Sequence, residues 1–184
     1  MGIPRSIKKT TLKPGGTVPL LVGVEGGMRF PESRFYVRTI RMDHQSPLVA
    51  TLRDAGYRVE PDRVVPRTVV AYFPIALPES TRVDRDVSLW EKAALFTAIQ
   101  AYWSDNLVSA TLTFQPHEAK DVARVLDVHT GRWKGVSFLP VSDHDYAQPP
   151  YAAITKEEYE ELASRLKPLS EVFGKVHDKE DKFC

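Results

Sequence analysis

Residues 108–141, VSATLTFQPHEAKDVARVLDVHTGRWKGVSFLPV, decide the fold class of this 184-residue chain. Val108 to Phe114 alternates apolar residues with Ser and Thr, which predicts a strand with one polar face. A helix with an apolar stripe is expected from about His117 to His129, before Gly131. A second strand, Val136 to Val141, follows closely. This order predicts a right-handed crossover between parallel strands.

Upstream segments extend the pattern. Thr68 to Ile75 predicts a buried strand, and Asp86 is expected to cap a helix that ends near Asp105. The expected apolar stripe of that helix is formed by Val87, Trp90, Ala94, Ala98, Ala101 and Tyr102. The whole series therefore predicts an α/β fold with a parallel sheet of three strands, in which ligands bind at the carboxyl ends of the strands.

The flanking regions carry further elements. Residues 35–42 alternate and predict a strand, and Ser46 precedes a short helix that Gly56 closes. Thr155 to Glu158 is a capping box for a last helix that runs toward Phe173.

A glycine turn precedes an apolar segment near the start of the chain. Lys13-Pro14-Gly15-Gly16-Thr17 runs into Val18 to Val24, a helix candidate with Pro19 in its first turn. Two glycines let an anion approach the backbone N–H groups, and a helix start favours negative charge. The turn predicts either a phosphate cradle or an ordinary turn, because both common nucleotide-binding glycine motifs are missing from the sequence.

The composition of the chain argues against several classes of function. The 25 basic and 24 acidic residues create no net field for nucleic acid or an anionic membrane. No apolar run approaches the roughly 20 residues that span a bilayer, and the start lacks a secretory core, so a cytoplasmic location is expected. No histidine pair has the spacing of a helical metal site, and none is predicted. The single cysteine, Cys184, is either a free thiol at a frayed end or a thiol on a flexible arm.

Three blocks resemble one family when they are taken in order. They are Lys13 to Phe30 (KPGGTVPLLVGVEGGMRF), Ala101 to Phe114 (AYWSDNLVSATLTF) and Lys134 to Pro140 (KGVSFLP). Residues 36–61 also fit the pattern. The set resembles the cobalamin-dependent (class II) ribonucleotide reductases, in particular their monomeric ribonucleoside-triphosphate branch, over essentially the whole chain.

The resemblance implies a fold and a function. The catalytic domain of the family is a ten-stranded α/β barrel, so residues 1–174 are expected to form its C-terminal part and residues 175–184 a flexible redox-type tail. The implied reaction converts ribonucleoside triphosphates to 2′-deoxyribonucleotides, with a thiyl radical that adenosylcobalamin initiates.

The resemblance also implies site residues. One turn is expected to bind the substrate phosphates, and it consists of Gly15, Gly16, Thr17 and Val18. Pro19 stands where the family often has Ser, so one hydroxyl donor is missing. A second glycine turn, Gly26-Gly27 with Arg29 nearby, would lie on the same barrel rim. Contacts to cobalamin are assigned only to that rim.

Ser137 and Phe138 bear on the source of the radical. Reductases that import a radical from a second subunit carry a tyrosine pair at these places, and phenylalanine cannot relay a proton-coupled electron. Homolysis of adenosylcobalamin beside the active site is therefore favoured.

The remaining expectations concern partners. The thiyl-forming cysteine, the reducing cysteine pair and the catalytic carboxylate of the family have no counterpart motifs here, so the chain is expected to be inactive alone. It would be a piece of a split or truncated reductase, completed by an N-terminal fragment. Cys184 matches the first of two tail cysteines that thioredoxin-like proteins recharge. The alternative is a non-catalytic phosphate-binding or interaction subunit derived from the barrel.

Overall fold

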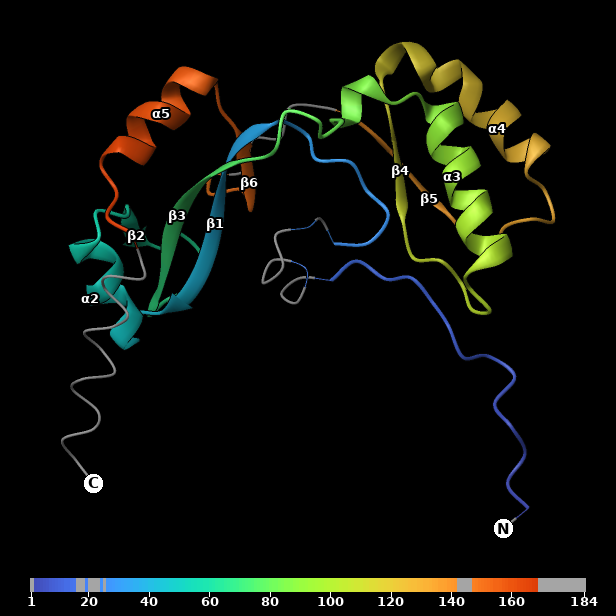
Figure 1. Cartoon of the computed structure of the whole chain (residues 1–184), viewed down its shortest axis with the longest axis horizontal. Coiled ribbons are helices and arrows are strands. Elements are labelled where there is room, and N and C mark those ends of the chain that lie inside the picture. Colours follow the sequence, from blue (N-terminus) through green and yellow to red (C-terminus); the bar gives the residue numbers. More distant parts are fainter. Residues whose placement is uncertain (1, 16–18, 20–23, 25, 142–146, 169–184) are drawn as a thin grey trace. The chain divides into compact units, whose positions relative to one another are not determined.

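The computed structural model describes residues 2–15, 19, 24, 26–141 and 147–168. The chain divides into two compact units, which are described separately (Figure 1). The first unit comprises residues 1–32 and 82–143, and the second comprises residues 33–81 and 144–184. The expected boundary between residues 174 and 175 lies outside the described residues and stays a prediction.

The second unit is built on a four-stranded sheet in the order β2-β3-β1-β6. β1 (Phe35–Asp43) pairs with β3 (Thr68–Ala76) in antiparallel fashion along its whole length. The short strands β2 (Val59–Pro61) and β6 (Tyr151–Ala153) form the two edges. The sequence predicted β1 and β3 but neither edge strand, because three residues show no usable periodicity.

Two helices accompany this sheet. α2 (Pro47–Asp54) begins after Ser46, as expected. α5 (Lys156–Ser164) has the predicted capping box, in which the Thr155 hydroxyl accepts from the Glu158 N–H at 3.1 Å and the Glu158 carboxylate accepts from the Thr155 N–H at 2.7 Å. α5 ends at Ser164, so the expected continuation toward Phe173 is wrong for residues 165–168, and residues 169–173 lie outside the described part.

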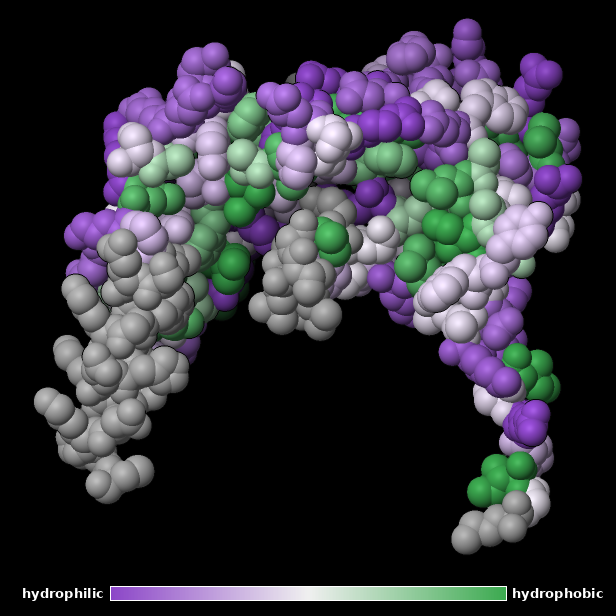
Figure 2. Space-filling view, in the orientation of Figure 1, coloured by the Kyte–Doolittle hydropathy of each residue, from purple (hydrophilic) through white to green (hydrophobic). Residues whose placement is uncertain are grey.

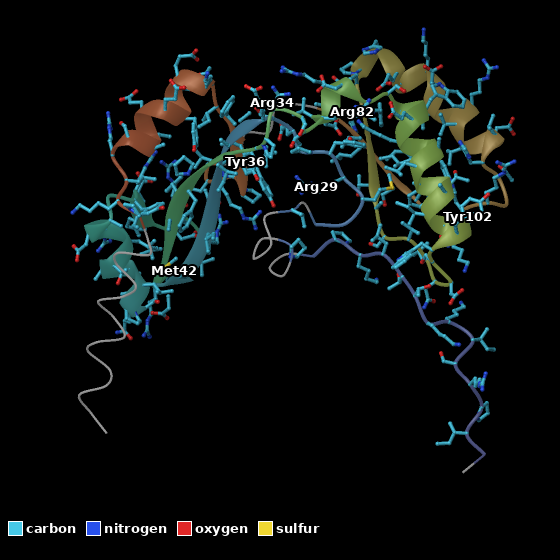
Figure 3. All side chains as sticks on the ribbon, in the orientation of Figure 1. Arg29, Arg34, Tyr36, Met42, Arg82 and Tyr102 are labelled. Atoms are coloured by element: carbon cyan, nitrogen blue, oxygen red, sulfur yellow. The ribbon has the colours of Figure 1, made fainter. Side chains whose placement is uncertain are left out.

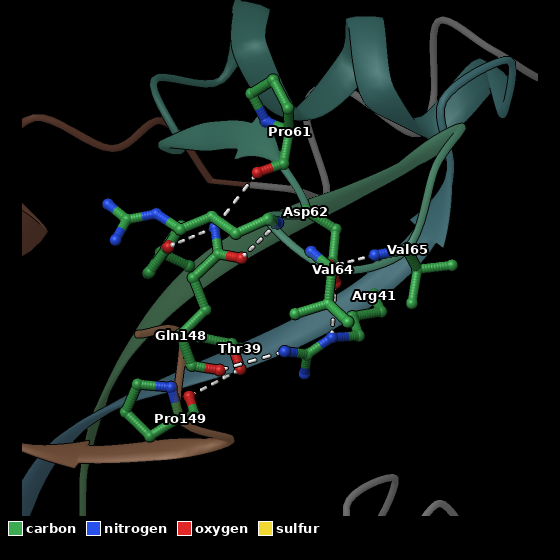
Figure 4. Close-up of polar contacts among 10 residues, drawn as sticks. Thr39, Arg41, Pro61, Asp62, Val64, Val65, Gln148 and Pro149 are labelled. Atoms are coloured by element: carbon green, nitrogen blue, oxygen red, sulfur yellow. Dashed lines mark hydrogen bonds and ion pairs between the residues drawn. The ribbon is translucent and has the colours of Figure 1, made fainter. Parts of the chain in front are cut away.

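Gln148 ties the segment before β6 to the rest of the second unit (Figure 4). The buried side-chain amide donates to the carbonyl oxygen of Pro61 at 3.1 Å. The backbone carbonyl of Gln148 accepts from the Arg41 guanidinium at 3.0 Å, and Arg41 also donates to the Asp62 carboxylate at 2.6 Å. These bonds satisfy polar groups that would otherwise be costly to bury.

The first unit contains the parallel pair that the sequence predicts. β4 (Thr111–Phe114) and β5 (Ser137–Pro140) are paired in parallel. The connection runs through the 3₁₀ helix η2 (Pro116–Asp121) and α4 (Val122–Val128). The crossover expected within residues 108–141 is therefore confirmed, although β4 begins three residues later than expected.

β3 does not belong to that parallel sheet, which corrects the expected three-stranded arrangement. It pairs with β1 through nine residues in antiparallel register. Strands that are close in sequence pair readily in this way, and the order of strands and helices alone does not reveal it. The α/β fold class is confirmed, while the ten-stranded barrel stays an expectation from the resemblance.

The buried face of α3 (Leu89–Tyr102) differs from the predicted stripe. Of that stripe Val87 is buried and Trp90 is partly buried against the core, but the other four residues are exposed. Leu89, Ala93 and Phe96 are fully buried, whereas the predicted stripe residues Ala98 and Tyr102 are exposed. The N-cap is Ser88 rather than Asp86, and its hydroxyl accepts from the Glu91 N–H at 3.2 Å. α3 is apolar on both sides, so periodicity could not select the buried one.

The buried face of α3 anchors the core of the first unit. The core consists of Met28, Leu89, Ala93, Phe96, Val108, Leu112 and Val125. Trp133 packs edge-on against Phe96, with ring centroids 5.1 Å apart. Trp103, in contrast, is 63% exposed.

Candidate functional site

The two glycine turns of the first unit lie against each other. A Cβ atom on Gly26 would come within 2.3 Å of the carbonyl oxygen of Gly15. A Cβ atom on Gly27 would lie 2.9 Å from the Cα atom of Pro14, and Gly27 has a φ of +78°. Glycine is required at both positions, because a side chain would collide with backbone. The structure thus brings together the turns at Gly15 and Gly26 that the sequence singled out.

The core of the first unit holds both turns in place. Leu12, just before the first turn, is partly buried against the core, and Met28, just after the second, is part of it. The Leu12 carbonyl also accepts from the Ser109 N–H at 2.9 Å. These anchors fix the backbone that enters the first turn and leaves the second.

Two exposed cations flank the paired turns in sequence. Lys13 precedes Gly15, and Arg29 follows Gly27 (Figure 3). Backbone N–H groups of glycine turns together with a guanidinium and an ammonium suit an anion such as phosphate.

Several predicted site residues lie outside the described part of the chain. They are Gly16, Thr17, Val18 and Cys184. Phosphate contacts by Gly16, Thr17 and Val18 and the redox role of Cys184 therefore stay predictions. Gly15 is described, and a Cβ atom there would lie 2.7 Å from the ring of Pro19.

The sequence analysis did not predict a buried ion pair that lies beside β4. The Lys92 ammonium on α3 lies 2.9 Å from the Asp84 carboxylate, with side chains only 3% and 11% exposed. Lys92 also donates to the carbonyl and the hydroxyl oxygen of Thr113, both at 3.1 Å. The second Asp84 carboxylate oxygen is buried without a hydrogen-bond partner. The signal that could have revealed the pair is a lysine on the buried side of an apolar helix.

A second polar cluster surrounds His129, which is buried at the end of α4. Its ring stacks on Trp133 with centroids 4.6 Å apart, and Nδ1 lies 2.9 Å from the Thr97 hydroxyl oxygen. Burial lowers the pKa of His129, and the charge of Arg132 lowers it further. The cluster therefore favours a neutral imidazole packed inside the first unit.

Ser104 and Phe138 make contacts of a structural kind. The Ser104 hydroxyl donates to the Asn106 carbonyl at 2.7 Å, a local side-chain to backbone bond after the end of α3. Phe138 on β5 lies 6.4 Å from Trp133, between ring centroids. Among the described residues, no three His, Cys, Asp or Glu side chains gather as metal ligands. None of the described helices combines the length and apolarity that crossing a membrane requires.

The chain matches no protein-family model. It is 40% identical over 191 residues to the adenosylcobalamin-dependent ribonucleoside-triphosphate reductase of Euglena gracilis, a match that covers 99% of this chain and 26% of that enzyme. It is 39% identical over 168 residues to the reductase of the same description from Lactobacillus gasseri, covering 88% of this chain and 22% of that enzyme. The chain is a homologue of these reductases. It spans about a quarter of their length.

A solved structure agrees with this relationship. The crystal structure of a B12-dependent (class II) ribonucleotide reductase is similar to the chain with a TM-score of 0.78 and 33% identity. The similarity covers 91% of this chain and 24% of that one. The resemblance to class II ribonucleotide reductases, stated from three blocks of sequence, is thereby confirmed.

Proposed function

We propose that the chain is the C-terminal piece of a ribonucleotide reductase that converts ribonucleoside triphosphates to 2′-deoxyribonucleotides. The observation that carries this proposal is the homology of almost the whole chain, 99% of it, to a quarter of the Euglena gracilis enzyme. Adenosylcobalamin is the cofactor named for the relatives and would supply the initiating radical to the complete enzyme.

The contribution of this chain is binding of the substrate phosphates. The packed turns at Gly15 and Gly26 provide a fixed backbone, and Lys13 and Arg29 provide positive charge. Thr17 adds a hydroxyl under this proposal. Fixed N–H donors, with cations beside them in the sequence, suit the binding of a triphosphate.

The glycine geometry does not support a cobalamin contact at the second turn. The space that side chains at Gly26 and Gly27 would occupy is filled by Gly15 and Pro14. The approach of one turn to the other accounts for these glycines, and the possible cobalamin contact of Gly26, Gly27 and Arg29 stays a prediction.

The radical chemistry needs cysteines that this chain lacks, since its one cysteine is Cys184. The thiyl-forming cysteine and its reducing pair would come from the remaining part of the reductase. The Cys184 thiolate would attack the disulfide of the oxidised reducing pair, which forms a mixed disulfide and releases one cysteine of the pair as a thiolate. A thioredoxin-like dithiol would then resolve the mixed disulfide and become oxidised itself, because a lone thiol cannot complete that step.

The test mixes this chain with the segment of the Euglena gracilis reductase that it does not cover, adds adenosylcobalamin, a ribonucleoside triphosphate and a dithiol, and measures deoxyribonucleotide. Turnover only in the mixture is expected. Lys13→Ala together with Arg29→Ala should raise KM roughly a hundredfold and leave kcat unchanged, because each hydrogen bond to a charged group contributes roughly 1.5 kcal/mol. Lys120→Ala, an exposed lysine on η2, is the matched control. Assembly without any turnover would overturn the proposal and favour the non-catalytic subunit.

A further inference from the structure

The outer face of α3 is apolar and exposed. We define it by five exposed residues on one side of the helix: Ala94, Leu95, Ala98, Ala101 and Tyr102. Leu95 is 40% exposed and Tyr102 is 91% exposed. Figure 2 shows apolar side chains gathered over α3 and the neighbouring β4, and Figure 3 shows Tyr102 at the C-terminal end of α3.

This face is additional to the one that forms the core. At about 100° per residue, the five positions span about 120° of the helix surface, opposite the buried residues Leu89, Ala93 and Phe96. A helix with one buried face normally carries polar residues on the other. A contiguous exposed apolar surface marks a site of interaction, with another protein, a membrane or a ligand.

The surface continues beyond the end of α3 into a segment that is already ordered. Trp103 is 63% exposed and Leu107 is 43% exposed. The carbonyl of Trp103 accepts from the Thr10 hydroxyl at 2.6 Å, and the carbonyl of Leu107 accepts from the Thr11 hydroxyl at 2.8 Å. Because the backbone is held before any partner arrives, little ordering entropy opposes docking.

Beyond the first turn of α3, the outer face carries no charged residue. In that first turn Glu91 lies on the same side, and its carboxylate is paired with Arg82 at 2.5 Å. An uncharged, aromatic-bearing surface is typical of the core of permanent interfaces, whereas transient contacts are richer in charge.

We propose that the outer face of α3 docks the part of the reductase that this chain does not cover. The proposal rests on the proposed function and commits to that occupant, because about three quarters of each relative's length lies outside the part that the chain matches. The apolar character of the face fits a permanent contact within one enzyme. The docking partner presents a complementary apolar surface to α3.

A labelling experiment tests the proposal directly. In a Cys184→Ser background, Ala98→Cys places a thiol on the outer face, and Ala123→Cys places a matched thiol on an exposed position of α4. A maleimide should modify both rapidly in the isolated chain. After addition of the uncovered segment of the Euglena gracilis reductase, the thiol at position 98 should react at least tenfold more slowly and that at position 123 at an unchanged rate. Slow modification at position 98 before mixing, or equal rates after mixing, would overturn the proposal.

A charge substitution provides the second test. Ala98→Glu should weaken association with the same reductase segment at least tenfold, while Ala123→Glu, with the same change in an exposed helix, should leave it unchanged. Circular dichroism of both variants checks that α3 and α4 are retained. If sedimentation shows instead that Ala98→Glu abolishes a dimer of this chain and leaves association with the reductase segment intact, a second copy is the occupant and the proposal is wrong.

The two proposals fail in different ways. Protection of position 98 in an assembly that makes no deoxyribonucleotide refutes the proposed function and retains the docking face. Full turnover and unchanged association with Ala98→Glu refutes the docking face and retains the proposed function.

Discussion

Gly27 and Gly131 separate two reasons for needing glycine. Both have a positive φ, +78° and +77°, but a Cβ atom would meet Pro14 at Gly27 and open space at Gly131. We expect Gly131→Ala to cost about 1 kcal/mol through backbone strain and Gly27→Ala at least about 1 kcal/mol more through overlap with backbone. Urea unfolding of the two variants measures the difference. Equal losses would show that the two glycine turns are not in close contact.

The buried pair Lys92–Asp84 makes a second prediction at the residue scale. Lys92→Met should destabilise the chain by about 3–5 kcal/mol, because it leaves a buried carboxylate without its counter-ion. Adding Asp84→Asn should recover part of that loss, since the remaining group is neutral. Denaturant melts of both single variants and the double variant give the coupling energy. Additive losses would contradict a direct interaction.

His129 makes the stability of the first unit depend on pH. Its pKa is lowered from the ordinary value of 6.5 by burial, so below that pH the unfolded chain binds a proton that the folded chain does not. Stability should therefore fall as the pH drops from 6.5 toward the folded-state pKa, with no further loss from this group below it. His129→Phe keeps a ring beside Trp133 and removes the titration, so its melts between these pH values should vary less. An identical pH profile in this variant would assign the effect to other groups.

At the scale of elements, two adjacent residues of α3 should behave oppositely. Phe96 is fully buried, and Leu95 is exposed on the outer face. In the isolated chain, Phe96→Ala should cost about 3–5 kcal/mol, because it leaves a cavity in the core. Leu95→Ala should change stability by less than about 0.5 kcal/mol. Thermal and urea unfolding of both variants tests the assignment of the faces, and a large loss from Leu95→Ala would reverse it.

The same helix shows where sequence reasoning stopped. The position of α3, the capping box at Thr155 and the parallel crossover after Val108 follow from local signals, and the structure confirms them. The sequence did not predict which face of α3 is buried, because both sides of the helix are apolar. The sequence did not predict which strand pairs with β3 either, because pairing and register depend on two strands together and cannot be seen in one segment.

The candidate site was only partly accessible from sequence. Glycine spacing located both turns, but their contact at Gly15 and Gly26 depends on how the core positions Leu12 and Met28. The Lys92–Asp84 pair joins residues eight positions apart across a helix start, and no motif describes such a pair.

At the scale of the whole molecule, open strand edges and exposed apolar surface should govern whether the isolated chain associates in solution. Within the described residues, β4 and β5 form a two-stranded sheet, so each has an unpaired edge, and the outer face of α3 is exposed. Open strand edges and apolar faces promote association. The weight-average sedimentation coefficient of the isolated chain should rise with concentration, and less so with Ala98→Glu. A monodisperse monomer at every concentration would argue against this expectation.

The exposed face of α3 also has a consequence for the abundance of the chain in the cell. Chaperones and proteases continuously remove unfolded protein, so a stability loss of about 1–2 kcal/mol can change abundance several-fold. We expect surplus copies, those made without a counterpart to cover Leu95 and Tyr102, to be cleared first. Under the docking proposal, the amount of this polypeptide would then follow the amount of its counterpart.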